Sequence, residues 1–149
     1  MAITRQKLRE IIFQLLYSYD MAGSDVAKMI PLIAQKLKVS KKNILIGDEK
    51  ARRIIQKQEA IDKLIVEASQ SYEFKRIQSV ERNILRIAIF ELLYDEEIPC
   101  KVAISEACRL CRKFSSSDGA GFINAILDSI YKNTDESQLE KKALPDNLD

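Results

Sequence analysis

The segment from Ser79 to Tyr94, SVERNILRIAIFELLY, restricts the fold more than any other part of the chain. Beyond its first few positions it is apolar on almost every side, and only Arg86 and Glu91 interrupt the middle. A helix that is apolar all round must be covered on most of its circumference by other elements. We therefore predict an all-α fold around an enclosed central helix. Because unpaired charges would be costly there, Arg86 and Glu91 should form ion pairs with neighbouring helices.

Composition favours one compact helical domain. The 149 residues include 46% apolar and 31% charged residues but only 4 Gly and 3 Pro, which suits a helical globular protein better than a sheet or a disordered chain. We expect a single helical domain over residues 1–132 and a polar, disordered tail over residues 133–149. No apolar run approaches the roughly 20 residues that span a bilayer, so we expect a cytoplasmic protein without membrane contact.

The chain lacks the usual parts of a catalytic or metal site. It has no His, which removes the commonest general base, the Ser-His and Cys-His nucleophile pairs and the mixed zinc sites. The three cysteines, Cys100, Cys108 and Cys111, are too few for a four-thiolate zinc site, and we expect them to be small apolar side chains in a reducing compartment. No enzymatic activity, cofactor or metal is expected.

A basic and aromatic row is predicted on the outer face of the first helix, which Thr4 should cap. Arg9, Phe13 and Tyr17 follow one another at steps of four residues, so a guanidinium and two rings share one face. Such a row suits single-stranded RNA, because unstacked bases lie on aromatic rings while Arg and Lys contact phosphates. The alternative is that Phe13 and Tyr17 pack against a neighbouring helix or subunit.

Several residues predict helix boundaries. Gly23 should end the first helix, Pro31 should kink or split the second, and Gly47 with Asp48 should break or re-cap the third. Residues 72–78 should form a short polar connection. A later helix is expected to start at Ile54 and another at Pro99, and Ser79 and Asp118 should cap the central and the last helix.

A second basic cluster follows the third predicted helix. It consists of Lys50, Arg52, Arg53 and Lys57. Acidic residues lie close by in the sequence, so a solvated helix face is a simpler interpretation of this cluster than a ligand site.

The order and spacing of several motifs resemble those of the NusB family of transcription antitermination factors. The family pattern LRxAxxEL appears as LRIAIFEL from Leu85, and the family's KVAINEA appears as KVAISEA from Lys101, after Pro99. The later KF and FIN match a KxF and FxN pattern. Near the N-terminus, RE from Arg9 and QLLY from Gln14 match the family as well. The resemblance covers residues 4 to 132.

The resemblance implies an all-helical fold of about seven helices, in two three-helix bundles packed across one another. Members of this family bind the boxA segment of nascent ribosomal RNA together with the ribosomal protein NusE, and join the RNA polymerase antitermination complex. For this chain it therefore implies single-stranded, boxA-like RNA, NusE and that complex as partners, without catalysis. By motif position, the implied RNA contacts are Arg5, Lys7, Arg9, Tyr17, Glu81, Arg86, Asp118 and Phe122.

Two other hypotheses stay open at this point. The same fold is found fused to RNA methyltransferases, so one alternative is an RNA-targeting domain related to those enzymes. The other is a structural helical adaptor or homodimer, in which the aromatic face of the first helix is a protein interface.

Overall fold

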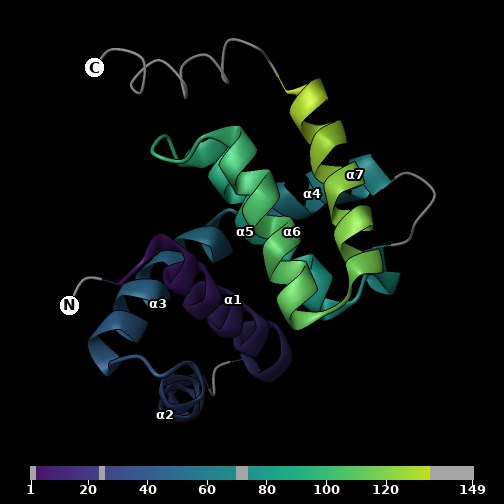
Figure 1. Ribbon diagram of the computed structural model, residues 1–149. Helices are drawn as coiled ribbons and strands as arrows, with labels where there is room; N and C mark the ends of the chain where they lie inside the picture. The colour runs from purple at the N-terminus through teal and green to yellow at the C-terminus, as the bar shows by residue number, and fades with distance from the viewer. Residues whose placement is uncertain (1–2, 24–25, 70–73, 135–149) are drawn as a thin grey trace, which may run out of the picture. The chain divides into compact units, whose positions relative to one another are not determined.

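The computed structural model describes residues 3–23, 26–69 and 74–134. Within these ranges the chain forms seven α-helices, one short 3₁₀ helix and no strand, which confirms the predicted all-α class (Figure 1). The chain divides into two compact units, Met1–Lys57 and Gln58–Asp149. Of the predicted tail, Asn133 is the last residue of α7 and Thr134 caps it, while residues 135–149 lie outside the described residues. The helices are α1 Arg5–Ala22, α2 Val26–Leu37, α3 Lys41–Gln56, α4 Gln58–Ser69, η2 Phe74–Arg76, α5 Ser79–Tyr94, α6 Cys100–Phe114 and α7 Ser117–Asn133.

The first unit is built on α1, which packs against both α2 and α3. Thr4 caps α1 as predicted, because its side chain accepts a hydrogen bond from the backbone N–H of Lys7. Gly23 follows the last helical residue with a φ of 65°, a conformation that glycine adopts without strain, so the predicted end of the helix is confirmed. The largest side chains of this core are Ile11, Leu15, Leu16 and Ile44.

Pro31 does not split the second helix, and the predicted break at Gly47 and Asp48 is wrong. Pro31 lies inside α2, and the helix continues through it to Leu37. Gly47 and Asp48 lie in the middle of an unbroken α3. Gly47 is kept there by packing, since its missing side chain leaves room for Ile11 of α1. Helix propensity alone would penalise this glycine by about 1 kcal/mol, and the close approach of two helices outweighs that cost.

Asp48 is a buried link between two helices of the first unit. The Tyr19 hydroxyl on α1 donates to one carboxylate oxygen of Asp48 at 2.6 Å, and Arg52 Nε donates to the other at 2.9 Å. Burial and the hydrogen bond to Asp48 raise the pKa of Tyr19, with burial the larger cause. The Asp48 carboxylate thus accepts hydrogen bonds from side chains of α1 and α3 and does not cap a new helix.

The second unit encloses α5, as predicted from its sequence. Helix α5 packs against α4, α6 and α7, and its middle turns are buried on all sides. Helices α6 and α7 pack closely against each other within the same unit (Figure 1). Cys108 and Cys111 are buried and carry free thiols, which confirms their expected role as small core side chains. The fully buried large residues of this unit are Ile61, Ile65, Ile84, Leu85, Ile89, Leu92, Leu110 and Ile123.

Three of the predicted helix boundaries and caps are wrong. Ile54 belongs to α3, and the chain breaks only at Lys57, before α4. Ser79 is the first residue of α5 and not its cap, because its hydroxyl accepts from Arg82. Helix α7 is capped by Ser116, whose hydroxyl accepts from the Gly119 N–H at 3.1 Å. Pro99 does precede α6 as predicted.

Replacing Gly47 with alanine should destabilise the first unit. An added Cβ would lie 2.5 Å from Ile11 Cγ2 and 3.3 Å from Ile11 Cβ, both in the packed core. Overpacking of this kind costs about 1–3 kcal/mol, which the better helix propensity of alanine offsets by about 1 kcal/mol. We expect a net loss in the free energy of unfolding, measured by urea denaturation. Gly121→Ala is the matched control, because nothing lies within 4 Å of an added Cβ there and the change should stabilise α7. A Gly47→Ala variant as stable as Gly121→Ala would contradict the packing argument.

Candidate nucleic-acid interface

The first turns of α1 carry the cations predicted for this surface. Arg5 is exposed, and Lys7 is partly exposed. Lys7 Nζ lies 3.5 Å from a carboxylate oxygen of Glu10, whose side chain is buried. A contact of this length near solvent holds Lys7 weakly, so its ammonium group is available to a phosphate.

The outward row of Arg9, Phe13 and Tyr17 is wrong for two of its three members. Arg9 and Phe13 are only 5% and 3% exposed, because α1 is buried on most of its circumference. The ring of Phe13 packs against that of Tyr17, with their centroids 6.1 Å apart. For Phe13 the alternative interpretation, packing inside the protein, is therefore correct. Tyr17 is half-buried and keeps one part of its ring accessible.

The second unit contains a hollow of about 310 Å³ that gathers the other predicted residues. Glu81 lies in the first turn of α5, and Asp118 and Phe122 lie in the first two turns of α7. The starts of two helices and the chain before α5 thus meet around one space. The hollow is lined by Arg76, Ile77, Gln78, Glu81, Ser116, Asp118, Gly119 and Phe122.

Close packing fixes the position of the Glu81 carboxylate in this hollow. A Cβ added to Gly119 would lie 2.5 Å from Glu81 Oε1 and 2.8 Å from Cys111 Sγ, so α7 approaches both groups as closely as only glycine allows. Burial raises the pKa of Glu81. Burial is also the largest cause of the raised pKa of the Cys111 thiol. The carboxylate of Glu81 is therefore partly desolvated and held in place.

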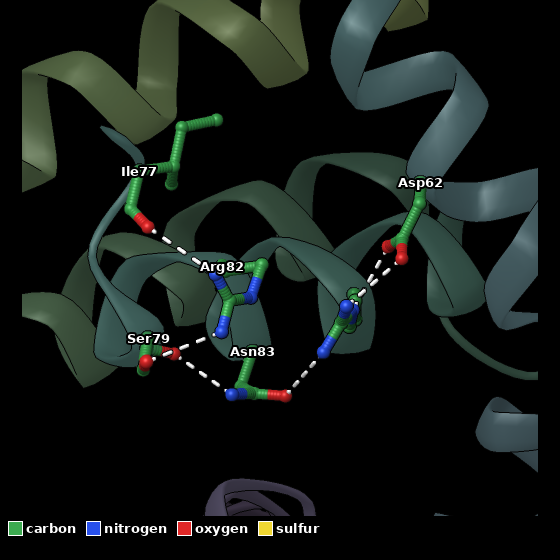
Figure 2. Close-up of polar contacts among 6 residues, drawn as sticks. Asp62, Ile77, Ser79, Arg82 and Asn83 are labelled. Carbon is green, nitrogen blue, oxygen red and sulfur yellow. Dashed lines mark hydrogen bonds and ion pairs between the residues drawn. The ribbon is translucent and has the colours of Figure 1, made fainter. Parts of the chain in front are cut away.

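Arg86 does not reach the hollow's lining, because its guanidinium is buried in an ion pair. Arg86 is 3% exposed and forms a bidentate ion pair with Asp62 of α4, in which both N···O distances are 2.8 Å. A third donor, Nη1, binds the side-chain oxygen of Asn83 at 3.0 Å. The predicted ion pair with a neighbouring helix is confirmed for Arg86. Figure 2 shows Asp62 facing the helix that carries Asn83 and Arg82.

The same group of side chains holds the segment that forms one wall of the hollow. Arg82 donates to the Ile77 carbonyl at 3.4 Å and to the Ser79 hydroxyl at 3.2 Å (Figure 2). The Phe74 ring lies under both arginines, 5.6 Å from Arg82 Cζ and 6.0 Å from Arg86 Cζ. Residues 74–78 are thereby tied to α5.

Sequence reasoning missed Arg76, Phe74 and Asp62. Arg76 and Phe74 lie in the stretch that was predicted to be a short polar connection, and Asp62 lies on α4. A signal was present in the case of Asp62, since a buried Arg86 requires an acidic partner. No periodic pattern in the sequence identifies which carboxylate that is.

The described residues contain no group of His, Cys, Asp and Glu that could hold a metal ion. In the same part of the chain, no helix has both the length and the apolar character that crossing a membrane requires.

Comparison with known proteins identifies the family. The model of the NusB family matches residues 6–132. The chain belongs to the NusB family. The transcription antitermination protein NusB of Chlamydia pneumoniae is 39% identical over 133 residues, which cover 89% of this chain and 82% of that protein. The protein of the same description from Desulfosudis oleivorans is 34% identical and covers 97% of this chain and 94% of that protein.

Solved NusB structures share the fold. T. maritima NusB superposes with a TM-score of 0.76 at 27% sequence identity, covering 94% of this chain and 99% of that chain. A chain from a complex of the antitermination factors NusB and NusE with double-stranded RNA gives a TM-score of 0.73 at 22% identity, covering 87% of this chain and 97% of that chain. The second likeness bears on the fold alone.

Removing the partner of Arg86 should destabilise the second unit strongly. Asp62→Ala leaves a guanidinium buried without its carboxylate, which typically costs about 3–5 kcal/mol. The Asp62 side chain is itself 23% exposed, so water can replace part of the contact, and we expect the lower end of that range. The double variant Asp62→Leu/Arg86→Met should recover most of the loss, because no charge is then buried. Chemical denaturation of the wild type and the two variants measures the loss of stability and its recovery. Equal stability of Asp62→Ala and the wild type would show that the pair is unimportant.

Glu81 should make stability depend on pH in a defined direction. Because burial raises its pKa, the folded state favours the protonated form. This contribution to stability is full below the pKa of the unfolded state and is lost as the pH rises through the raised pKa. Glu81→Gln should therefore be more stable than the wild type at neutral pH and equal to it in acid, as followed by thermal unfolding. Glu59→Gln, at an exposed position of α4, controls for the loss of one negative charge.

Proposed function

We propose that this chain is an RNA-binding transcription antitermination factor. It binds a boxA-like segment of ribosomal RNA transcripts together with the ribosomal protein NusE, and joins the RNA polymerase antitermination complex in the cytoplasm without catalysing a reaction. Membership of the NusB family supports this proposal, since the relatives at 39% and 34% identity are transcription antitermination proteins. The absence of His from the sequence is in keeping with a binding role.

The observation that carries the proposal is the hollow in the second unit. Three residues expected to contact RNA from motif position alone, Glu81, Asp118 and Phe122, line the same space. Their chemistry suits an unstacked base: the ring of Phe122 offers a stacking surface, and the two carboxylates accept hydrogen bonds from the amino groups on base edges. Arg76 at the same hollow adds a cation for the neighbouring phosphate.

The first unit supplies phosphate contacts and a second ring. Arg5 and Lys7 offer their charges to phosphates, and the accessible part of Tyr17 offers a surface for a base. Arg9 is buried, so its proposed part is to support this surface from beneath.

Arg86 has a positioning role in this proposal. Its guanidinium is engaged by Asp62 and Asn83, and it shares the Phe74 ring with Arg82, which holds the Ile77 carbonyl. The wall of the hollow formed by residues 76–78 therefore depends on a buried group that does not itself touch RNA.

Titration of RNA with and without NusE tests the proposal. We expect weak binding of a boxA-like single strand by the chain alone and tighter binding with NusE, because the partner supplies further contacts. The logarithm of the affinity should fall with the logarithm of salt concentration at a slope near −0.7 per phosphate contact. A double-stranded RNA is measured in parallel, since a protein of this fold was solved with NusE and double-stranded RNA. The absence of RNA binding under all these conditions would overturn the proposal.

Variants locate the surface. Arg5→Ala/Lys7→Ala should lower the salt slope by about 1.4, for two lost phosphate contacts. Tyr17→Leu should weaken binding by about 1–3 kcal/mol if the ring stacks on a base. Lys63→Ala/Lys101→Ala removes two exposed cations elsewhere and is the matched control. Light scattering of the same samples checks the homodimer alternative: a stable dimer whose formation is lost in Tyr17→Leu would assign Tyr17 to a protein interface instead.

A further inference from the structure

Positive charge is concentrated in one part of the first unit. The chain as a whole has 24 Lys and Arg against 22 Asp and Glu. Residues 26–57, which cover α2 and α3, hold nine of those cations and only two of the acidic residues. The rest of the chain is therefore acidic on balance. The small net charge of the whole chain is therefore the sum of a strongly basic segment and an acidic remainder.

Eight of the nine cations of this segment are exposed, and its two acids offset little of their charge. Of the two carboxylates, Asp48 is 8% exposed and engaged by Tyr19 and Arg52. Glu49 is the one exposed acid among described residues 26–57. The surface, called here the α2–α3 basic face, is made by the exposed Lys28, Lys36, Lys38, Lys41, Lys42 and Arg53.

Stability of the fold does not explain three of these lysines. Lys41 and Lys42 stand in the first turn of α3, which holds no acidic residue, and the helix dipole disfavours cations there by about 0.3–1 kcal/mol each. Lys38 follows α2 with a φ of 56°, a conformation in which Gly or Asn is preferred. Residues that go against a local structural preference without stabilising the fold tend to lie at functional sites.

Solubility does not explain the basic face either. Like charges gathered on one surface repel one another, whereas charges of both signs dispersed over the surface keep a protein soluble without that cost. The remainder of the chain does mix both signs. A polyanion bound at the basic face would relieve the repulsion.

We propose that the α2–α3 basic face binds the phosphate backbone of RNA without reading its sequence. This rests on the proposed function and adds a second contact surface to it. Residues 26–57 contain no Phe, Tyr or Trp, so no base can stack on an aromatic ring there, and phosphates are the RNA groups that its exposed lysines suit best. Such a surface also supplies affinity that the first helix lacks, since its Arg9 is buried.

An acidic protein segment is the competing occupant. Leu45 and Ile46 are 52% and 41% exposed on α3 and would suit an apolar contact at the centre of a protein interface. With Leu32 of α2, which is 58% exposed, three large aliphatic side chains lie among six exposed cations, so charge outweighs apolar area in this segment. The charge therefore favours RNA, and the experiment includes a peptide to decide.

The test compares two charge-matched variants of the full chain. Lys41→Gln/Lys42→Gln/Arg53→Gln removes three exposed cations from the basic face. Lys63→Gln/Lys101→Gln/Arg112→Gln removes three exposed cations from the second unit and changes the net charge equally. Binding of a boxA-like RNA and of a scrambled RNA of equal length is titrated with NusE present over a range of salt concentrations. Circular dichroism establishes that both variants are folded.

The basic-face variant should lower the salt slope for both RNAs by up to about 2, because three phosphate contacts at about 0.7 each are lost, while the control keeps the wild-type slope. Equal slopes in the two variants would overturn the inference, as would a poly-glutamate peptide that binds the wild type more tightly than the scrambled RNA does. Wild-type protein that binds neither RNA would instead overturn the proposed function. The two failures are thus distinguishable.

Discussion

The buried guanidinium of Arg86 is the group on which the second unit depends. An arginine that is 3% exposed inside an apolar helix is stable only when its charge and its donors are matched. Asp62 supplies the charge and Asn83 takes a third donor. These contacts are directional, so they fix the position of α4 on α5 more narrowly than apolar packing would. A core of Ile and Leu alone would tolerate small sliding of one helix over the other.

The same two arginines also determine the position of a surface segment, residues 74–78. Phe74 lies against both Arg82 and Arg86, and Arg82 in turn holds the Ile77 carbonyl. Residues 74–78 are thus held against α5 by the side chains of Arg82 and Arg86. Because residues 76–78 form one wall of the hollow, the shape of the hollow follows from a buried ion pair on another side of α5. The central helix therefore acts both as the core of its unit and as the support of its proposed binding site.

Sequence alone predicted the elements whose signals are local and periodic. The enclosed α5, the Thr4 cap and the end at Gly23 follow from apolar spacing and cap chemistry. The failures share one cause, which is that tertiary contacts override a local preference. Gly47 lies within a helix because Ile11 of α1 occupies the space of a side chain there. The Ser79 hydroxyl accepts a hydrogen bond from Arg82 instead of from a backbone N–H. The candidate site divides in a similar way. The motif positions predicted Glu81, Asp118 and Phe122, which line one hollow. Arg76 and Phe74 belong to no periodic pattern, and only their tertiary contacts identify them.

The distribution of charge suggests how one chain of nearly neutral total charge can select RNA. The hollow carries Glu81 and Asp118, and a carboxylate repels a phosphate while accepting hydrogen bonds from base amino groups. Non-specific backbone binding is therefore weak at the hollow, and a base that satisfies the carboxylates is favoured. Acids at the proposed binding site would also lower the overall affinity for a polyanion. In the proposed arrangement Arg76 is the one cation among the residues that line the hollow, and the cations of α1 and of the α2–α3 basic face would supply most of the attraction from other surfaces.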